Sequence, residues 1–293
     1  MNDIDIVIPW LNPTDKWFSQ YKNYCENESP GRIRDLNTMQ PALRSILKNL
    51  PWIRYIWLIV FDEEQHQNLD WEELKNKKVK FVYHSDIIPK EFIPNFNSMI
   101  SEAYIHKIDG IADYFIFSND DIIFNNYISK EYYLKNNKVV HRKKTLHEHK
   151  DVFWWTYSYI INSSSNFVKH ITGKKFLSDD FHMPSIHKTD LLKFLWSKYE
   201  KYMYDSFTDS KIRKRKNLSL VDVMNTLEEM YNLCEYDECS SIKTSPIWLN
   251  DKTTKTDLIN LKNNYDIICV NDGEVLSDSH SKIIANYIKE VFK

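Results

Sequence analysis

The chain has 293 residues, of which 42% are hydrophobic and 14% aromatic, with only 4 glycines. This composition excludes a disordered or low-complexity protein. Because 39 lysines and arginines nearly balance 41 aspartates and glutamates, charge gives no reason to expect nucleic-acid binding. No stretch reaches the roughly 18 apolar residues of a membrane span, and the N-terminus lacks the basic and apolar regions of a signal peptide.

The four cysteines are scattered, with one Cys-x4-Cys pair and no second pair to complete a zinc site. We therefore expect reduced thiols in a cytoplasmic protein without a transmembrane segment. The sequence leaves open a peripheral association with the inner face of a membrane.

Strand-like and helix-like patterns alternate along the chain. Buried strands are predicted at 4–8, 53–60, 79–84, 113–118 and 265–270. Helices are predicted at 39–50, around Trp71, at 98–108, from 191, from 218 to 233 and at 281–292. This alternation predicts an α/β fold with a central, mostly parallel sheet and helices on both faces. We expect one domain over 1–293, with a helical and aromatic insertion at 127–176.

Two adjacent carboxylates interrupt the apolar run from Asp113 to Phe124. Asp120 and Asp121 follow a strand of aromatic and aliphatic residues. Ligands of open α/β sheets bind at the carboxyl ends of the strands, and Mg²⁺ favours one or two carboxylates together with phosphate oxygens. The pair is therefore a candidate metal site, and a polar turn between two strands is the alternative.

A second strand ends in the same dipeptide, because Asn271 and Asp272 echo Asn119 and Asp120. If the two strands are neighbours, their ends could converge on one cation. Asp272 is therefore a further candidate ligand.

Other chemistry-bearing residues have more than one interpretation. Glu102 and His106 lie one turn apart on a predicted helix, away from its apolar stripe. They could form a functional pair, or they could simply face solvent. Arg44 could reach a phosphate or face solvent. The basic run at 211–216 suits a solvated loop, a phosphate or membrane-surface patch, or a diphosphate clamp. His182, ahead of a helix, suits a general base or a packing role.

The segment 127–176 mixes aromatic and basic residues. Aromatic faces pack on sugar rings, so the segment suits acceptor recognition, and packing within the domain is the simpler explanation. His147 and His149 have metal-ligand spacing but lack a third ligand.

Taken together, these segments resemble the Stealth family of sugar-1-phosphate transferases. The resemblance covers nearly the whole chain in four ordered regions. It is carried by Ile4–Trp10, Arg34-Asp35, Leu43–Ile46, Pro51–Arg54, His84–Pro89, Asn95–Ser98, Ile100, Glu102, His106, Asn119–Asp121, His182–Pro184 and Cys269–Asp272. The chain departs from the family pattern at 39–45 and in the spacing from Arg215 to Asp222, which leaves open whether Arg213 or Arg215 takes the role of the family's arginine.

The resemblance implies a Rossmann-like nucleotide-sugar transferase that moves a hexose or N-acetylhexosamine 1-phosphate from a UDP-sugar to a glycan hydroxyl. UMP is released, in capsular or cell-surface polysaccharide synthesis, and the acceptor is an oligosaccharide or polysaccharide that can be lipid-linked. It implies catalytic roles for His182, Asp120, Asp121, Glu102 and His106, and Mg²⁺ or Mn²⁺ on Asp120, Asp121 and Asp272. Substrate-binding residues would be Asp5, Trp10, Arg34, Asp35, Arg44, Asn95, Asn97, Ser98, Asn119, Arg213 and Arg215.

Two rival functions fit the same sequence. A conventional glycosyltransferase would release UDP. A non-catalytic glycan-binding protein would use aromatic residues such as Trp154 and Trp155 and consume no UDP-sugar.

Overall fold

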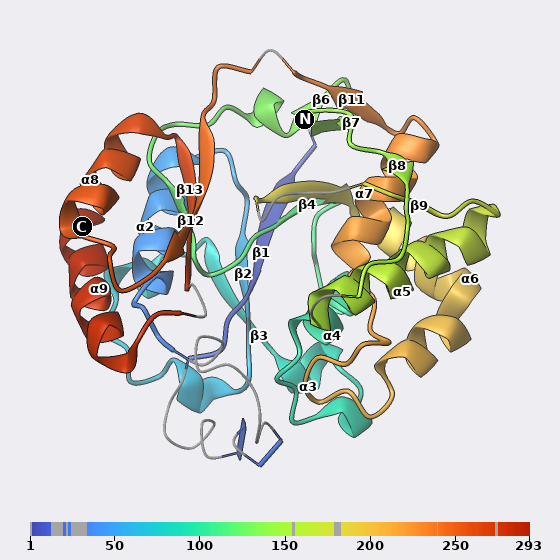
Figure 1. Cartoon of the computed structure of the whole chain (residues 1–293), viewed down its shortest axis with the longest axis horizontal. Helices are drawn as coiled ribbons and strands as arrows, with labels where there is room; N and C mark the ends of the chain where they lie inside the picture. Colours follow the sequence, from blue (N-terminus) through green and yellow to red (C-terminus); the bar gives the residue numbers. More distant parts are fainter. Residues whose placement is uncertain are drawn as a thin grey trace.

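The computed structural model describes residues 2–12, 20–21, 23–24, 34–153, 156–178, 183–238, 240–272 and 275–293. A five-stranded sheet in the order β10-β4-β1-β2-β3 forms the centre (Figure 1). Its strands are β1 (Ile4–Pro9), β2 (Ile56–Val60), β3 (Val79–Tyr83), β4 (Tyr114–Phe117) and β10 (Ser185–Lys188). β1 runs parallel to β2 and β4, and β2 to β3, whereas β10 is antiparallel to β4. The predicted mostly parallel sheet is confirmed.

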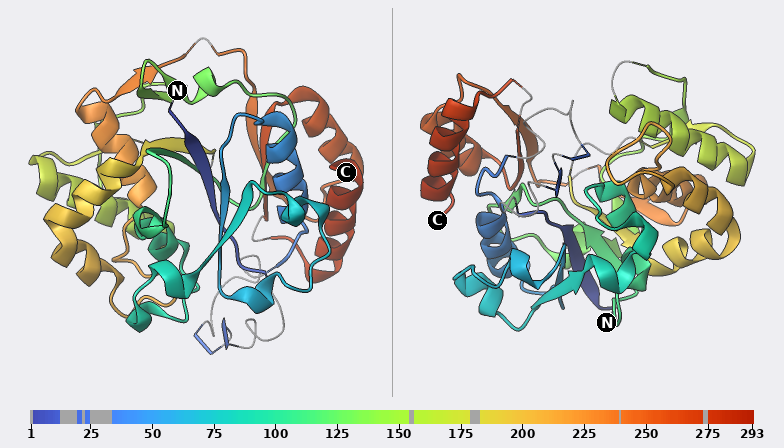
Figure 2. Two further views of the ribbon diagram at one scale, coloured as in Figure 1. Left: turned by 180° about the vertical axis from the view of Figure 1, so that it is seen from behind. Right: turned by 90° about the horizontal axis from the view of Figure 1, so that it is seen from below.

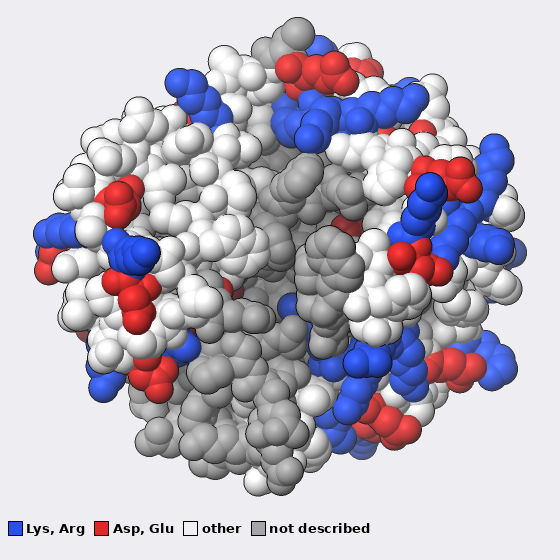
Figure 3. Space-filling view, viewed as in Figure 1, with Lys and Arg blue, Asp and Glu red and all other residues white. Residues whose placement is uncertain are grey.

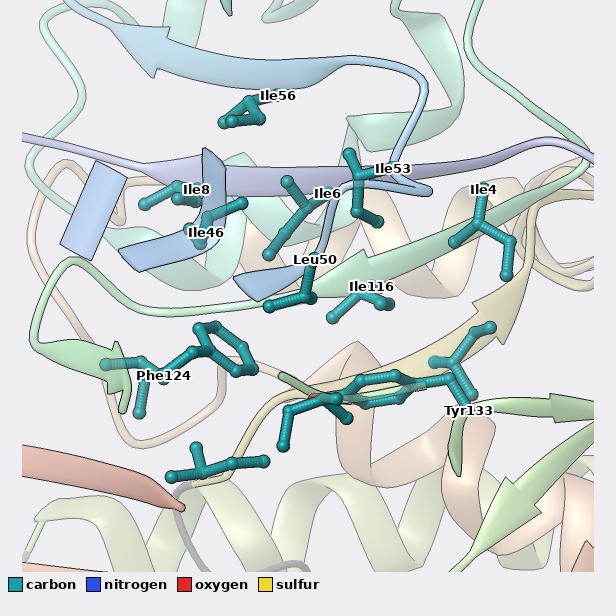
Figure 4. Packing of buried hydrophobic residues seen from close by; sticks show 14 of the residues in the cluster. Ile4, Ile6, Ile8, Ile46, Leu50, Ile53, Ile56, Ile116, Phe124 and Tyr133 are labelled. Atoms are coloured by element: carbon teal, nitrogen blue, oxygen red, sulfur yellow. The ribbon is translucent and has the colours of Figure 1, made fainter. Parts of the chain in front are cut away.

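Alternate side chains of β1 enter two cores, as the period of a strand requires. Ile6 and Ile8 pack with helix α2 (Met39–Asn49), and Figure 4 shows them beside Ile46 and Leu50. Val7 belongs to the core on the other face. That face is covered by α4 (Ser98–Ala103), α5 (Thr156–Thr172), α6 (Thr189–Phe207) and α7 (Leu220–Met230). Helices therefore lie on both faces, as predicted (Figure 2).

A second sheet stands beside the first, in the order β12-β13-β5. It contains β12 (Thr244–Leu249), β13 (Ile267–Asp272) and β5 (Ile122–Phe124), with β13 antiparallel to β5. Helices α8 (Lys255–Asn264) and α9 (Asp278–Val291) pack on it around a third core that includes Ile268 and Ile284. The chain that leaves β4 through Asp120 and Asp121 thus enters a different sheet.

Two small sheets lie within and beside 127–176. One has the order β11-β7-β6, from β11 (Cys234–Tyr236), β7 (Lys138–His141) and β6 (Leu134–Lys135), and the other pairs β8 (His147–Glu148) with β9 (Phe176–Leu177). Tyr132 and Tyr133 lie in the first core and Phe167 lies in the second. For these three rings, packing within the domain is the role that the structure shows.

Several predicted helices are shorter than expected. The structure also contains a short helix, α3 (His84–Ile87). It has five 3-10 turns in the described residues, η2 (Glu63–Gln65), η3 (Glu72–Lys75), η4 (Lys90–Phe92), η5 (Ile105–Lys107) and η6 (Lys130–Tyr132). The stretch around Trp71 is therefore a 3-10 turn. The helix predicted at 98–108 divides into α4 and η5, and at the end of α4 the Ala103 carbonyl accepts a hydrogen bond from the Trp196 indole at 2.6 Å. None of the helices in the described ranges is long and apolar enough to cross a bilayer.

Candidate functional site

Asp120 and Asp121 lie in the turn that joins β4 to β5. β4 ends at Phe117, and the next backbone amide, of Ser118, donates to the Val7 carbonyl at 3.0 Å. Since β4 is parallel to β1 and β1 to β2, the turn lies at the carboxyl edge of the central sheet, as predicted. Asn119 closes the turn by accepting a hydrogen bond from the Ile122 amide at 3.4 Å.

Strand β13 holds the Asp121 side of this turn. The Val270 amide donates to the Asp121 carbonyl at 2.8 Å, and the Cys269 thiol donates to Asp121 Oδ2 at 3.3 Å. Burial, together with the charge of Asp121, raises the pKa of Asp120 to about 7. Two adjacent carboxylates in a partly buried turn attract a proton or a divalent cation, so this donor set fits Mg²⁺ bound together with phosphate oxygens.

Asp272 lies at the end of β13, alongside the same turn, but its carboxylate faces another group. Arg34 Nη1 is 3.4 Å from Asp272 Oδ2, and Arg34 Nε is 3.4 Å from Asp278 Oδ1. Burial raises the pKa of Asp272 to about 6, against the opposing effect of Arg34. Over the described ranges, no three His, Cys, Asp or Glu side chains form a metal-binding group. The expected third ligand is thus paired with Arg34 instead of joining the carboxylate pair.

A second group of expected residues gathers around Glu102. Arg213 Nη2 donates to Ser98 Oγ at 2.6 Å, and the Tyr157 hydroxyl donates to Asp222 Oδ2 at 3.1 Å. Burial raises the pKa of Glu102 to about 8, and the Asp222 charge adds to this effect while Arg213 opposes it. Glu102 Oε2 has no hydrogen-bond partner among the residues that the structure describes. Glu102 therefore presents a protonated carboxyl at neutral pH.

The two groups share one edge of the sheet. Phe61 follows β2 directly, and its ring centroid lies 5.6 Å from that of Phe96. Residues 95–98, which lead into α4, are therefore placed at the carboxyl edge, where Asp120 and Asp121 follow β4. The expected residues form a carboxylate turn and a buried Glu102–Arg213 group along this edge.

Asn95 and Asn97 hold this second group in place instead of facing a ligand. Asn97 is fully buried, and its amide donates to the Ser210 carbonyl at 3.0 Å and to Asn217 Oδ1 at 2.8 Å. Asn95 is 2% exposed and accepts a hydrogen bond from the Asn97 amide at 3.0 Å. The expected substrate-binding roles are corrected accordingly, because Asn97 anchors the loop that carries Arg213 and Asn95 holds the backbone of Asn97.

Asp5 is also removed from the predicted site. It lies near the start of β1, at the opposite edge of the sheet, and is fully buried. Its carboxylate accepts hydrogen bonds from the side chains of Arg54 and Trp57 and from the amides of Tyr55 and Ala112. Asp5 is therefore a structural anchor.

Trp10, Arg44 and His106 are likewise engaged elsewhere. Trp10 is 6% exposed and packs against Trp71, with ring centroids 5.6 Å apart. Arg44 Nε donates to Glu73 Oε1 at 2.6 Å.

His106 stacks on Trp196, at 5.8 Å between ring centroids, and burial lowers its pKa to about 4. It does not pair with Glu102, because α4 has ended before His106 is reached. The expected catalytic pair is therefore not formed.

The remaining expected residues divide by position. Asp35 is exposed, and its charge contributes to the raised pKa of Asp120, so it lies near the carboxylate turn. Arg215 is exposed and stacks on Tyr159, whereas Arg213 joins the buried group. His182 lies outside the described residues. Sequence reasoning did not assign Asp222 or Tyr157 to the site, although the family spacing between an arginine and Asp222 was a signal for Asp222, which lies in the first turn of α7.

A buried histidine–glutamate network, formed by His141, His187, Glu228 and Glu229, was not predicted. Glu228 lies 3.1 Å from His141 Nε2 and 3.4 Å from His187 Nδ1. Glu229 lies 3.6 Å from His141 Nδ1 and accepts hydrogen bonds from Tyr236, Thr145 and Ser178. Hydrogen bonds to the two glutamates raise the pKa of His141 to about 9 against the effect of burial, and lower that of Glu229 to about 2.

The buried carboxyl of Glu102 gives a stability prediction. Because its pKa is raised from 4.5 to about 8, the folded protein keeps a proton that the unfolded chain releases, and the free energy of unfolding should fall from pH 4.5 to 8. Glu102→Gln, which mimics the protonated form, should remove this fall and exceed wild type by about 2 to 4 kcal/mol at pH 8.5. Urea unfolding at pH 5 and 8.5 measures the difference. Equal pH dependence of the two proteins would contradict it, and Glu148→Gln, at an exposed glutamate, is the control.

The fold is that of an α/β protein with a mostly parallel central sheet, a class in which ligands commonly bind at the carboxyl ends of the strands. Residues 32–142 match the family model for Stealth protein CR2, conserved region 2. Over this region the chain is similar to the Stealth family.

Several curated relatives are capsular polysaccharide phosphotransferases. The chain is 27% identical to that of Actinobacillus suis over 76% of this chain and 63% of that protein. It is 24% identical to WcwK of Streptococcus pneumoniae over 100% of this chain and 96% of that protein. It spans 52% of SacB from Neisseria meningitidis serogroup A, at 27% identity. The chain thus covers less than two thirds of the length of some relatives and nearly all of another.

Two solved structures align at lower similarity. The galactosyltransferase LgtC aligns at a TM-score of 0.40 and 10% identity, over 96% of this chain and 95% of that chain. Mouse xyloside xylosyltransferase 1 aligns at 0.44 and 10%, over 92% of this chain and 98% of that chain.

Proposed function

We propose that this protein is an enzyme that transfers a sugar 1-phosphate from a UDP-sugar to a hydroxyl of a glycan acceptor, releasing UMP. The observation that carries the proposal is the Asp120–Asp121 turn at the carboxyl edge of the sheet, on the same edge as the buried Glu102–Arg213 group. The named phosphotransferases among the relatives support the same class of reaction.

The reaction forms one bond and breaks one. The acceptor oxygen attacks the β-phosphorus of the UDP-sugar, and the bond from that phosphorus to the bridging oxygen of UMP breaks. The acceptor proton passes to a base, and the bond from the anomeric carbon to its oxygen stays intact. Such a transfer depends on alignment and on neutralising charge at the phosphoryl and leaving oxygens.

The charged residues of the two groups suit these tasks. Asp120 and Asp121 would hold Mg²⁺, or Mn²⁺, which when bound supplies positive charge beside the phosphate oxygens. Arg213, which donates to Ser98 Oγ, would bind the diphosphate, because a guanidinium can pair with two phosphate oxygens. Glu102 is 4% exposed, so it would orient donor or acceptor through the neighbouring Arg213 and not by direct contact. Arg34 and Asp35, which lie next to the turn, would contact the same ligand.

His182 is the proposed base, on the strength of the family resemblance alone. A neutral imidazole accepts a hydroxyl proton near pH 7. His182→Gln should therefore lower turnover by about 10²-fold or more with little change in donor affinity. Steady-state rates together with donor binding by calorimetry test this, and unchanged turnover would remove His182 from the mechanism.

The identity of the released nucleotide tests the proposed function. A panel of UDP-sugars is incubated with the protein, Mg²⁺ and a glycan acceptor, and the nucleotides are separated by chromatography. UMP that appears only when acceptor is present supports the proposal. UDP would indicate a conventional glycosyltransferase, and glycan binding with no nucleotide released from any donor would indicate a binding protein.

A further inference from the structure

The loop that carries Arg213 into the buried group reaches the surface two residues later. Lys214, Arg215 and Lys216 are exposed there. The Arg215 guanidinium carbon lies 4.3 Å from the centroid of the Tyr159 ring. Phe153, 61% exposed, meets Tyr159 edge to face at 5.5 Å. We call Phe153, Tyr159 and Arg215 the Arg215 platform.

Hydrogen bonds hold this platform in a defined position. The Arg215 carbonyl accepts a hydrogen bond from Ser163 Oγ at 2.9 Å, one turn after Tyr159 on α5. The Lys214 amide donates to Asn217 Oδ1 at 2.6 Å, and Asn97 donates to the same oxygen. The platform and Arg213 are therefore parts of one anchored loop.

Two further cations adjoin Arg215 in the chain, because Lys214 and Lys216 are exposed on either side of it. Figure 3 shows one face of the molecule, on which the half that carries α5 and α7 bears Lys and Arg side chains with Asp and Glu side chains among them. Because the total charge of the chain is nearly balanced, the basic run at 211–216 is a local excess of positive charge. A guanidinium stacked on an aromatic ring keeps its outer N–H groups available for an anion, while exposed ring surface packs on a sugar.

The proposed reaction produces a ligand with both features. Transfer of a sugar 1-phosphate to a hydroxyl leaves a phosphodiester between two sugar units, with one negative charge at each new linkage. A product that serves again as acceptor therefore presents sugar rings and phosphodiester charges in alternation.

We propose that the Arg215 platform binds an acceptor glycan that already carries a phosphodiester, with the charge against Arg215 and a sugar on Phe153 and Tyr159. The identity of this ligand rests on the proposed function. The platform thereby makes the enzyme prefer its own anionic product over a neutral glycan, which favours repeated addition.

Equilibrium binding without donor tests this proposal separately from catalysis. The probes are a synthetic trisaccharide whose hexoses are joined by phosphodiesters and its uncharged methylphosphonate counterpart, measured by calorimetry. Wild type should bind the charged trisaccharide about tenfold more tightly, and Arg215→Gln should lose most of this preference while affinity for the uncharged form is kept. Tyr159→Leu should weaken binding of both.

Two further variants separate geometry from charge. Arg215→Lys keeps the charge without the planar stacking group and should keep only part of the preference. Lys289→Gln removes one charge at an exposed position of α9, away from the platform, and should leave binding unchanged. Equal affinity of wild type for both trisaccharides, an unaltered preference in Arg215→Gln, or equally tight binding of an oligothymidylate of the same charge would overturn the proposal. UMP release alongside such a result would leave the proposed function standing.

Discussion

Asp121→Asn should lower the rate of UMP release by about 10³-fold at saturating Mg²⁺, because one of two carboxylates that hold the cation is lost. The fold should be unaffected, since asparagine has the same shape and the Val270 amide still binds the backbone carbonyl at residue 121. The temperature of unfolding should stay equal or rise, because Asp120 no longer faces a like charge. Rates over an Mg²⁺ titration and a thermal melt measure both effects.

A matched substitution controls for the loss of one charge. Asp109→Asn changes an exposed aspartate outside the two groups and should retain the wild-type rate. Asp121→Asn with more than about a tenth of wild-type activity at saturating Mg²⁺ would be inconsistent with a metal ligand at this position.

Glu229→Gln should destabilise the fold by about 3 to 5 kcal/mol, the usual cost of removing one member of a buried ionic network. The carboxylate accepts hydrogen bonds from Tyr236 at 2.9 Å and from Thr145 Oγ1 at 3.0 Å. The amide N–H₂ group of glutamine would face the hydroxyl donor of Tyr236 or Thr145 without accepting its hydrogen bond. His141 would also lose the negative charge of the Glu229 carboxylate beside it. Urea unfolding measures the loss.

The pH dependence of this effect follows from two pKa values. The pKa of Glu229 is lowered from 4.5 to about 2, so its contribution is present above pH 4.5 and lost as pH falls through 2. That of His141 is raised from 6.5 to about 9, so its contribution is present below pH 6.5 and lost as pH rises through 9.

The difference between wild type and Glu229→Gln should therefore be largest near pH 5.5 and smaller at pH 9. Glu148→Gln, at an exposed glutamate, should match wild type. A variant within about 0.5 kcal/mol of wild type at pH 5.5 would show that the network does not stabilise the fold.

The central sheet and the carboxylate turn were predictable because their signals are local. Buried parallel strands read as continuous apolar runs, and the acids after Phe117 interrupt such a run. Helix α2 was predictable from the spacing of Leu43, Ile46 and Leu50, with Pro51 at its end. In each case, neighbouring residues carry the whole pattern.

The roles of individual polar residues were not predictable, because their partners come from distant segments. Asp5 resembled a site residue in the sequence, but in the structure its carboxylate accepts hydrogen bonds from Arg54, Trp57 and Ala112. Glu102 resembled a solvated residue because its spacing places it off the apolar stripe, yet α7 covers it and Asp222 faces it.

Pairing across the chain also explains the outcome for Asp272. Because β5 and β13 pair, the two Asn-Asp dipeptides at 119–120 and 271–272 lie near each other. Which way a carboxylate turns depends on the cation within reach, and Arg34 takes that position here. No periodicity at residue 272 could reveal an arginine 238 residues earlier in the chain.

Oxygen labelling tests most directly which bond of the donor breaks. A UDP-sugar carrying ¹⁸O in the bond between the anomeric carbon and the β-phosphorus is used with Mg²⁺ and acceptor, and the products are analysed by ³¹P NMR and mass spectrometry. The label should be found in the phosphodiester of the glycan product, with unlabelled UMP released. Label in released UDP, with a sugar joined to the acceptor through the acceptor's own oxygen, would contradict phosphoryl transfer.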